Sequence, residues 1–232
     1  MNSKQHININ LSNLTLVIPA KEDSDCLYKV LKELQNFNIH KIIVIPSDRS
    51  LPNSWEFKNL EIINQSKNGY GNALLEGIKN VKTKFFCIFN ADGSFNPEEI
   101  ENMFSKTNNY DFVFGSRYLE NAKSDDDTFI TRIGNYFFSK IGRIFFNLKL
   151  SDILYTYVIA NTAKFNELNV KSEDFCFCVE FPINMGKKKF SYIDTPSHER
   201  NRISGKKNVN EIVDGSKILF KMIELFFSKN NK

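Results

Sequence analysis

The sequence lacks the features that mark several common classes of protein. No apolar run reaches the roughly 18 residues that a membrane-spanning helix needs, and no apolar segment follows a basic stretch near Met1, because residues 1–13 are polar. A membrane span and a secretory signal are therefore not expected. Internal repeats and low-complexity linkers are also absent from the sequence.

The chain also has few cysteines and a small net charge. The chain has four scattered cysteines, of which Cys176 and Cys178 are separated by one residue and lack the spacing of a zinc site. Reduced thiols in a cytoplasmic protein are the simplest interpretation. The formal charge is only +4, from 31 basic and 27 acidic residues, which does not favour a nucleic-acid partner. With 232 residues, of which 41% are hydrophobic, the chain can bury one sizeable core.

The first half of the chain alternates short apolar runs with helix-like segments. Predicted strands are Leu14–Pro19, Lys41–Pro46, Leu60–Asn64, Phe85–Asn90 and Asp111–Gly115, each rich in β-branched or aromatic residues. Predicted helices are Ser24–Phe37, Asn72–Val81 and one that starts at Pro97. This alternation predicts an α/β fold with a mostly parallel central sheet flanked by helices.

The second half is predicted to be mainly helical after an exposed loop at 123–128, which contains three consecutive aspartates at 125–127. A long helix carries an apolar stripe made of Ile130, Ile133, Phe137, Ile141, Ile144 and Leu148. A helix at 172–185, a strand at 190–194 and an amphipathic C-terminal helix at about 208–227 follow it. This last helix suits the core, a bilayer interface or a partner protein, and the sequence leaves the three open. No linker divides the halves, so residues 14–228 are predicted to form a single domain after a polar tail, 1–13.

The segment KFFCIFNADGS, residues 84–94, contains the most specific local pattern. A buried strand stops abruptly at Asn90, Ala91 and Asp92. Polar groups at the carboxyl end of a parallel strand lie where open α/β sheets bind ligands. Their oxygen atoms suit a divalent cation or ribose hydroxyls. An ordinary turn explains the same residues, since Asn, Asp, Gly and Ser favour turns.

Five motifs extend this pattern over nearly the whole chain, roughly residues 14–213. They are VIPAKED at 17–23, GYGNALLEGIKN at 69–80, FNADGSFNPEEI at 89–100, FGSRY at 114–118 and RISGKK at 202–207. Each is weak alone. In this order and spacing they resemble family 2 glycosyltransferases, and among these most closely the dolichyl- and polyprenyl-phosphate sugar transferases.

The resemblance implies a single GT-A (Rossmann-like) domain whose first half, 14–118, binds the nucleotide sugar and whose second half, 119–228, faces the acceptor. It places Asn90 and Asp92 at the family's Asp-x-Asp pair, which holds Mg²⁺ or Mn²⁺ against the diphosphate. Here the first carboxylate is an amide, which can ligate a hard cation but brings no charge. His198 is a candidate third metal ligand or a surface histidine.

The other site residues follow from the same resemblance. Nucleotide-sugar binding is assigned to Pro19, Ala20, Glu22, Asp48, Gly69, Gly71, Asn90, Ala91 and Asp92. Phosphate or acceptor binding is assigned to Arg117, Arg132, Arg200, Arg202, Lys206 and Lys207, because guanidinium groups suit bidentate phosphate contacts. Catalytic roles are assigned to Asp92, Arg117, Asp152 and Glu180, although structural roles explain Asp152 and Glu180 equally well.

The implied reaction is transfer of a sugar, with inversion, from a nucleoside diphosphate sugar to a polyprenyl phosphate or a glycan precursor. A weakly active or non-catalytic sugar-nucleotide-binding relative is the main alternative, because of Asn90. A nucleotidyltransferase is another, but VIPAKED is not the Gly-rich, Lys-containing phosphate loop of that class. The expected location is the cytoplasm, with peripheral contact at the inner face of the membrane if the acceptor is a lipid phosphate.

Overall fold

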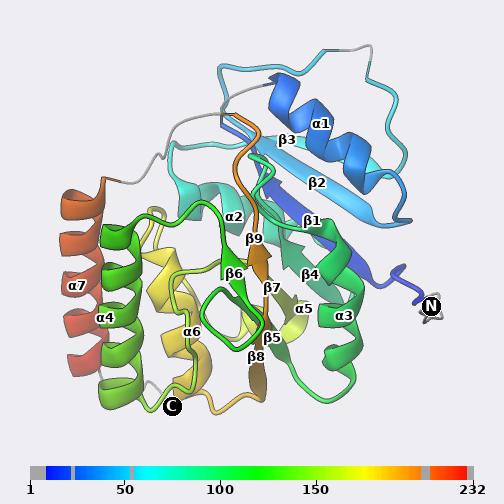
Figure 1. Ribbon diagram of the computed structural model, residues 1–232. Helices are drawn as coiled ribbons and strands as arrows, with labels where there is room; N and C mark the ends of the chain where they lie inside the picture. Colours follow the sequence, from blue (N-terminus) through cyan, green and yellow to red (C-terminus); the bar gives the residue numbers. More distant parts are fainter. Residues whose placement is uncertain (1–8, 22–23, 53–54, 205–209, 229–232) are drawn as a thin grey trace.

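A computed structural model describes residues 9–21, 24–52, 55–204 and 210–228. Its centre is a seven-stranded sheet with the strand order β3-β2-β1-β4-β7-β5-β8 (Figure 1). Neighbouring strands run parallel, except that β7 is antiparallel to both β4 and β5. A two-stranded parallel sheet joins β6 to β9.

The strands are short. Those of the large sheet are β1 (Leu14–Pro19), β2 (His40–Ile45), β3 (Leu60–Asn64), β4 (Phe85–Ile88), β5 (Phe112–Ser116), β7 (Val158–Asn161) and β8 (Tyr192–Pro196). The small sheet consists of β6 (Lys123–Ser124) and β9 (His198–Glu199). Because β1, β2, β4 and β5 are parallel, their carboxyl ends lie along the same edge of the sheet.

Helices cover both faces of this sheet. They are α1 (Ser24–Leu34), α2 (Tyr70–Lys79), α3 (Ile100–Ser105), α4 (Phe129–Phe146), α5 (Thr162–Asn166), α6 (Phe177–Lys187) and α7 (Glu211–Phe227), with 3₁₀ turns at Pro97–Glu99 and Lys106–Asn108. Side chains from α1 and α3 pack with one set of strand residues, and side chains from α2, α4, α6 and α7 pack with the other.

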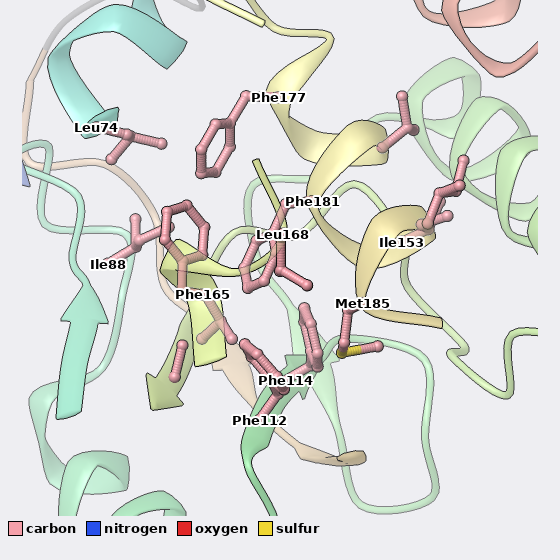
Figure 2. Packing of buried hydrophobic residues seen from close by; sticks show 14 of the residues in the cluster. Leu74, Ile88, Phe112, Phe114, Ile153, Phe165, Leu168, Phe177, Phe181 and Met185 are labelled. Carbon is pink, nitrogen blue, oxygen red and sulfur yellow. The ribbon is translucent and has the colours of Figure 1, made fainter. Parts of the chain in front are cut away.

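Alternation along the strands explains the two layers. In β1, Leu16 and Ile18 belong to the core under α1 and α3, whereas Val17 belongs to the core under α2 and α6. Figure 2 shows the second core, in which strand and helix aromatic side chains interlock; the rings of Phe165 and Phe181 meet edge to face with centroids 5.0 Å apart. Such contacts make this layer rigid beneath the sheet edge.

The expected fold class is confirmed: the sheet is mostly parallel, helices flank it, and a C-terminal amphipathic helix is present. The antiparallel strand β7 was not predicted from the sequence. Helix α6 begins at Phe177, five residues later than expected, because residues 171–176 form a loop instead. The division into a donor half and an acceptor half stays a prediction. In the described part of the chain, no helix is both long and apolar enough to cross a membrane.

Candidate active site

The turn after β4 brings Asp92 to the edge of the sheet. The Ser94 backbone N–H donates to Asp92 Oδ1 at 3.0 Å, and the Ser94 hydroxyl donates to the same oxygen at 2.6 Å. Gly93 permits this turn because it adopts a φ of +80°. The Asp92 side chain keeps 27% of its surface exposed. One carboxylate oxygen therefore fixes the turn, and the other, Oδ2, lies 3.6 Å from Arg202 Nε, beyond hydrogen-bond distance.

Asn90 lies beside a partly buried tyrosine, Tyr70. The Tyr70 hydroxyl is 3.4 Å from Asn90 Oδ1 and 2.7 Å from the Thr156 hydroxyl. Burial raises the pKa of Tyr70 well above its usual value, so the hydroxyl stays protonated. Thr156 can then donate to Tyr70 while Tyr70 donates to Asn90. A neutral hydroxyl thus holds the Asn90 amide oxygen at the site.

A segment that follows β9 covers the Asp92 turn. The Ile203 backbone N–H donates to the Asp92 carbonyl at 2.9 Å, and a side chain at Gly93 would collide with Ile203, 2.5 Å from the position of a Cβ. Arg202 Nε lies 3.6 Å from Asp92 Oδ2 and 3.1 Å from Asp126 Oδ2. One guanidinium therefore lies between two carboxylates directly at the candidate site.

Arg200 fastens the same segment to the turn. Its backbone N–H donates to the Ser94 carbonyl at 2.8 Å, and its guanidinium donates to the Phe95 carbonyl at 2.9 Å and to Glu33 at 2.8 Å. Within the described ranges, Arg200 Nε is buried without a hydrogen-bond partner. In this arrangement Arg200 holds protein groups, so a phosphate contact by Arg200 stays a prediction.

His198 is tied to the aspartate run after β6. Its Nε2 lies 2.6 Å from Asp125 Oδ2, and its backbone N–H donates to Glu99 at 2.6 Å. Burial raises the pKa of Glu99, although its hydrogen bonds favour the charged form. Among the residues that the structure describes, no three His, Cys, Asp or Glu side chains are gathered closely enough to hold a metal. Metal ligation by His198 therefore stays a prediction.

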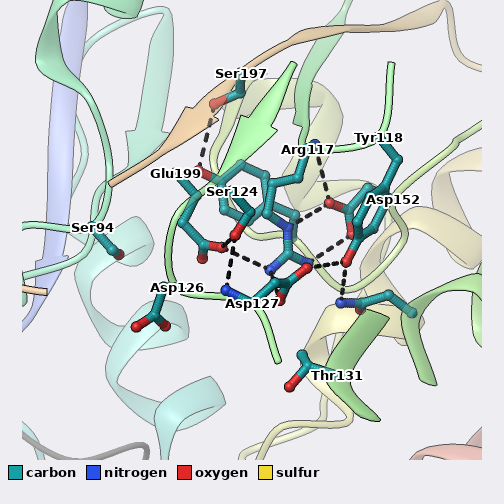
Figure 3. A network of polar contacts seen from close by, with 12 residues as sticks. Ser94, Arg117, Tyr118, Ser124, Asp126, Asp127, Thr131, Asp152, Ser197 and Glu199 are labelled. Atoms are coloured by element: carbon teal, nitrogen blue, oxygen red, sulfur yellow. Dashed lines mark hydrogen bonds and ion pairs between the residues drawn. The ribbon is translucent and has the colours of Figure 1, made fainter. Parts of the chain in front are cut away.

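Arg117 lies at the centre of a buried ionic network (Figure 3). Its Nε and Nη2 donate to the two carboxylate oxygens of Asp152 at 2.7 and 3.0 Å, and its Nη1 lies 3.3 Å from Asp127 and 3.2 Å from Glu199. Only 7% of the Arg117 side chain is exposed. The structure thus pairs Arg117 with protein carboxylates, above all with Asp152. Phosphate binding by Arg117 and the catalytic roles of Arg117 and Asp152 stay predictions.

This network holds in place the two segments that surround Asp92. Asp127 belongs to the loop that carries Asp126, and Glu199 belongs to β9, which leads to Arg202. Burial raises the pKa of Glu199, although Arg117 favours its charged form. By binding both segments, Arg117 fixes the positions of Asp126 and Arg202, and Arg202 in turn contacts Asp92.

Glu180 has a similar structural task on α6. The backbone N–H groups of Lys171 and Ser172 donate to Glu180 Oε2 at 3.1 and 2.7 Å, and only 4% of Glu180 is exposed. This carboxylate fixes the loop before α6 against the start of α2. A role as base or in orienting the acceptor stays a prediction.

Two glycines at the start of α2, Gly69 just before it and Gly71 in its first turn, accommodate that loop. A Cβ on Gly69 would lie 2.2 Å from the Glu173 carbonyl oxygen, and a Cβ on Gly71 would lie 2.2 Å from the Ser172 carbonyl oxygen. Gly69 also adopts a φ of +146°. Close packing of the protein's own backbone therefore explains both glycines, and their contact with a nucleotide stays a prediction.

Replacing Gly71 with alanine is expected to reduce the free energy of unfolding by about 1–3 kcal/mol, because backbone atoms must move to make room for the methyl group. Urea denaturation measures this change. Gly215, inside α7, is the matched control, because no described atom would lie within 4 Å of a methyl group added there. Alanine at Gly215 is expected to stabilise the protein by about 0.5–1 kcal/mol; equal effects at both positions would contradict the packing argument.

The remaining predicted residues fall into three groups. Pro19 ends β1, Ala20 follows it with its N–H donating to the Val44 carbonyl at 2.9 Å, and Asp48 is exposed in the loop after β2, so all three lie at the carboxyl edge of the sheet. Arg132 is exposed on the first turn of α4. Glu22, Lys206 and Lys207 lie outside the described residues.

Sequence reasoning missed several residues that shape this site. Tyr70 contacts Asn90 and Thr156 contacts Tyr70, Asp126 shares Arg202 with Asp92, and Glu99 anchors β9. The aspartate run at 125–127 was expected to be an exposed loop, but each of its carboxylates pairs with a different basic side chain and Asp127 is 5% exposed. The only sequence signal for this pairing is the short distance along the chain between FGSRY and the aspartate run, which allows Arg117 and Asp127 to belong to the same network.

Comparisons with known proteins agree with this geometry. The sequence model described as glycosyl transferase family 2 matches residues 15–168. No curated protein matches the sequence significantly. Among solved structures, glucosyl-3-phosphoglycerate synthase from Mycobacterium tuberculosis with Mn²⁺, uridine diphosphate and phosphoglyceric acid is similar, with a TM-score of 0.70 at 8% identity over 94% of this chain and 80% of that one.

Two further solved structures are similar over the same share of this chain. The same enzyme with Mg²⁺ and uridine diphosphate has a TM-score of 0.69 at 9% identity and is covered over 80% of its length. A structure described only as a mycobacterial protein has a TM-score of 0.66 at 11% identity, with 75% of it covered. At such low identity these likenesses establish the fold, which is the expected GT-A architecture.

Proposed function

The chain belongs to glycosyl transferase family 2, and from this premise we propose that it transfers a sugar from a nucleoside diphosphate sugar to a polyprenyl phosphate, with inversion at the anomeric carbon. The chain is thus a glycosyltransferase; the acceptor and the stereochemistry are the proposed part. A nucleotidyltransferase is no longer an alternative, because the family match covers the segments on which that alternative depended.

The observation that carries the proposal is the placement of Asp92. Its carboxylate lies at the carboxyl end of β4, in line with the ends of β1 and β2, where Pro19, Ala20 and Asp48 are found. This edge is where a parallel sheet binds a nucleotide. The similar synthase was solved with uridine diphosphate and either Mn²⁺ or Mg²⁺, which supports a nucleoside diphosphate donor here.

The residues at this edge fit a divalent cation. Asp92 offers one charged oxygen and Asn90 one neutral oxygen, and Mg²⁺ is commonly held by one or two protein oxygens together with substrate phosphates. The Asp92 side chain is 27% exposed, so a cation can approach it. Bound there, the cation would neutralise the charge that develops on the departing nucleoside diphosphate.

The protein's own groups divide the remaining work. Asp92 and Asn90 are the residues that would hold the cation, and Arg202 brings a positive charge within 3.6 Å of Asp92. An acceptor phosphate oxygen attacks the anomeric carbon as the bond from that carbon to the diphosphate oxygen breaks. The bonding electron pair leaves with the nucleoside diphosphate, and a single displacement inverts the centre.

The state of the two candidate bases supports a phosphate acceptor. Asp152 is 2% exposed and bound to Arg117, and Glu180 is 4% exposed and bound to two backbone N–H groups. Neither carboxylate is placed to take a proton from an incoming hydroxyl. A polyprenyl phosphate is already ionised at neutral pH and needs no base to become a nucleophile.

Nucleoside diphosphate release from a panel of nucleotide sugars, with Mg²⁺ or Mn²⁺ and with or without a short-chain polyprenyl phosphate, tests the proposal. We expect release from one donor class and acceleration by the acceptor. Binding of a donor without any release of nucleoside diphosphate would favour the alternative, a non-catalytic sugar-nucleotide-binding protein. The neutral side chain of Asn90 is the reason for this alternative.

Asn90 also allows a direct test of cation binding. Replacing Asn90 with aspartate is expected to tighten Mn²⁺ binding by about tenfold, because a carboxylate adds a full negative charge beside Asp92. Calorimetric titration of Mn²⁺ with nucleoside diphosphate present measures the affinity. Asn80→Asp, which adds the same charge at the far end of α2, is the control; unchanged affinity in Asn90→Asp would count against ligation by residue 90.

A further inference from the structure

Two parallel helices form an outer wall of the protein. Near their first turns, the Thr131 hydroxyl lies 3.1 Å from Glu211, and near their last turns the rings of Phe145 and Phe226 meet with centroids 5.6 Å apart. Helices α4 and α7 therefore lie side by side along their whole length, as Figure 1 shows. Both pack inward on α6, so they share one outer face.

This outer face is strongly apolar. The exposed large hydrophobic side chains on the two helices are Phe129, Ile130, Ile133, Tyr136, Phe137, Ile144, Phe145, Ile212, Val213, Phe220, Ile223, Phe226 and Phe227, which we call the α4–α7 face. Their exposed fractions reach 78% for Phe129 and 81% for Ile212. Single exposed apolar residues are ordinary, but a contiguous set of this extent marks an interaction surface.

The helical stripe that identified α4 in the sequence points outward. Ile130, Ile133, Phe137 and Ile144 are 49% to 64% exposed, whereas the buried side chains of α4 are Asn135, Phe138 and Ser139. Apolar periodicity normally marks the side of a helix that packs on the core. Here most of the stripe faces solvent, so a partner other than this protein's own core must account for it.

The charges that accompany this face identify the partner. Helix α4 contains no acidic residue but carries Arg132, Lys140 and Arg143, all exposed beside the apolar stripe. A helix with an apolar stripe flanked by cations is typical of segments that lie in the interface of an anionic bilayer. Helix α7 adds Lys217 and Lys221 but also Glu211, Asp214 and Glu224, so the two helices together carry five basic and three acidic residues. A second copy of the chain fits less well, because Asp214 and Glu224 already lie 3.9 Å from Lys217 and 3.3 Å from Lys221 and so offer little to the cations of α4.

The face also begins at the candidate active site. Asp126, which shares Arg202 with Asp92, precedes Phe129 by three residues, and Thr131 contacts the first turn of α7. The N-terminal ends of both helices therefore lie near the edge where the donor binds. A lipid-linked substrate that lies in a bilayer under this face would have its phosphate close to that edge.

We propose that the α4–α7 face docks the protein on the surface of an anionic membrane, with the aromatic and aliphatic side chains inserted at the level of the headgroups. The proposal rests on the proposed function only in so far as that function supplies a lipid-linked acceptor. Docking itself depends on the apolar area of the two helices and on the cations of α4.

Sedimentation of the full chain with vesicles tests this docking. We expect binding to vesicles of phosphatidylcholine and phosphatidylglycerol at about 3:1, and binding at least about tenfold weaker to phosphatidylcholine alone. The double variants Ile133→Ser/Phe137→Ser and Phe220→Ser/Phe227→Ser are each expected to weaken binding by about tenfold or more. Lys140→Gln/Arg143→Gln should weaken binding to the anionic vesicles and leave binding to neutral vesicles unchanged.

Ile62→Ser is the matched control, since Ile62 on β3 is 46% exposed but far from the face in the strand order. It should bind vesicles as the unchanged protein does. Unfolding curves of all variants show whether they remain folded. The proposal would be overturned if the protein did not bind vesicles, or if the control and the double variants bound them equally. It would also be overturned if analytical ultracentrifugation showed a dimer that the double variants disrupt, with no vesicle binding.

The failure of docking can be told from the failure of the proposed function. Transfer to a water-soluble, short-chain polyprenyl phosphate without vesicles should be the same in Phe220→Ser/Phe227→Ser as in the unchanged protein. If transfer is absent while anionic vesicles are still bound, the proposed function fails and docking stands. If transfer occurs and vesicles are not bound, docking fails and the function stands.

Discussion

Replacing Asp92 with alanine is expected to reduce the rate of sugar transfer by about 10²–10³-fold or more, the range seen when one group that stabilises developing charge is removed. Asp92 is the charged member of the Asn90 and Asp92 pair. Its loss would remove the only formal negative charge that this pair offers to a cation. Nucleoside diphosphate release under saturating donor and Mn²⁺ measures the effect.

The effect of Asp92 must be separated from the loss of the turn that it stabilises. Ser94 donates two hydrogen bonds to Asp92 Oδ1. Ser94→Ala removes the hydroxyl donor and leaves the carboxylate, so it serves as the control. We expect Ser94→Ala to keep activity within about tenfold of the unchanged protein, since one hydrogen bond to a charged group contributes about 1.5 kcal/mol. Equal losses in the two variants would mean that the turn, and not the carboxylate, accounts for the effect.

Replacing Arg117 with alanine is expected to have the largest effect on stability, a loss of about 3–5 kcal/mol in the free energy of unfolding. Arg117 is the cation shared by Asp152, Asp127 and Glu199, and all three carboxylates are at most 8% exposed. Without it, three acidic groups would remain buried together. Urea denaturation at neutral pH measures the loss.

The loss at Arg117 should depend on pH. Burial already raises the pKa of Glu199 in the folded protein above its value in the unfolded chain. Protonation of Glu199 therefore favours the folded state, and this contribution to stability is present at low pH and lost as the pH rises through the raised pKa. Removing Arg117 takes away a charge that lowers this pKa. The destabilisation is therefore expected to be smaller at about pH 5 than at about pH 8.

An exposed arginine supplies the control for this substitution. Arg132 lies on the first turn of α4, and Arg132→Ala is expected to change stability by no more than about 0.5 kcal/mol. If Arg117→Ala were as mild as Arg132→Ala, the network would not have the structural importance that its burial implies. Destabilisation that is equal at the two pH values would contradict the role of the buried carboxylates.

The sequence predicted most strands of the parallel sheet and the turn at Asn90 and Asp92, because both depend on local patterns. Short apolar runs followed by polar turns specify strands and their ends. The antiparallel strand β7, Val158–Asn161, has no such signal: it is only four residues long and its neighbours in the sheet are distant in sequence. Tertiary pairing determines it.

Arg117 and the aspartate run show why the role of a charged residue is hard to predict. From the sequence, FGSRY suggested a phosphate contact and the run suggested an exposed loop. In the structure they bind one another, through Asp127, across a buried network. Both interpretations considered one segment at a time. The network instead depends on β9 and the loop at 125–127 lying next to each other, and these segments come together only in the folded chain.

The apolar stripe of α4 correctly indicated a helix, but it could not show what the stripe contacts, for a related reason. Periodicity identifies a helix with one apolar side, but it does not identify what that side contacts. Phe137 and Ile144 belong to the stripe and remain 49% and 64% exposed, while Asn135 is buried. The hypothesis that the C-terminal helix suits a membrane interface therefore extends to α4, whose stripe had been identified from the sequence without a partner.

Transfer of an isotope-labelled sugar to a polyprenyl phosphate, in the presence of Mn²⁺, tests the central claim most directly. The donor should be the nucleotide sugar that releases nucleoside diphosphate in the panel, and the organic-phase product should be collected for both the unchanged protein and Asp92→Ala. We predict a labelled lipid product with the inverted anomeric configuration from the unchanged protein, and about 1% of that product or less from Asp92→Ala. Label that stays in the aqueous phase with every donor, or an Asp92→Ala yield equal to that of the unchanged protein, would contradict the account.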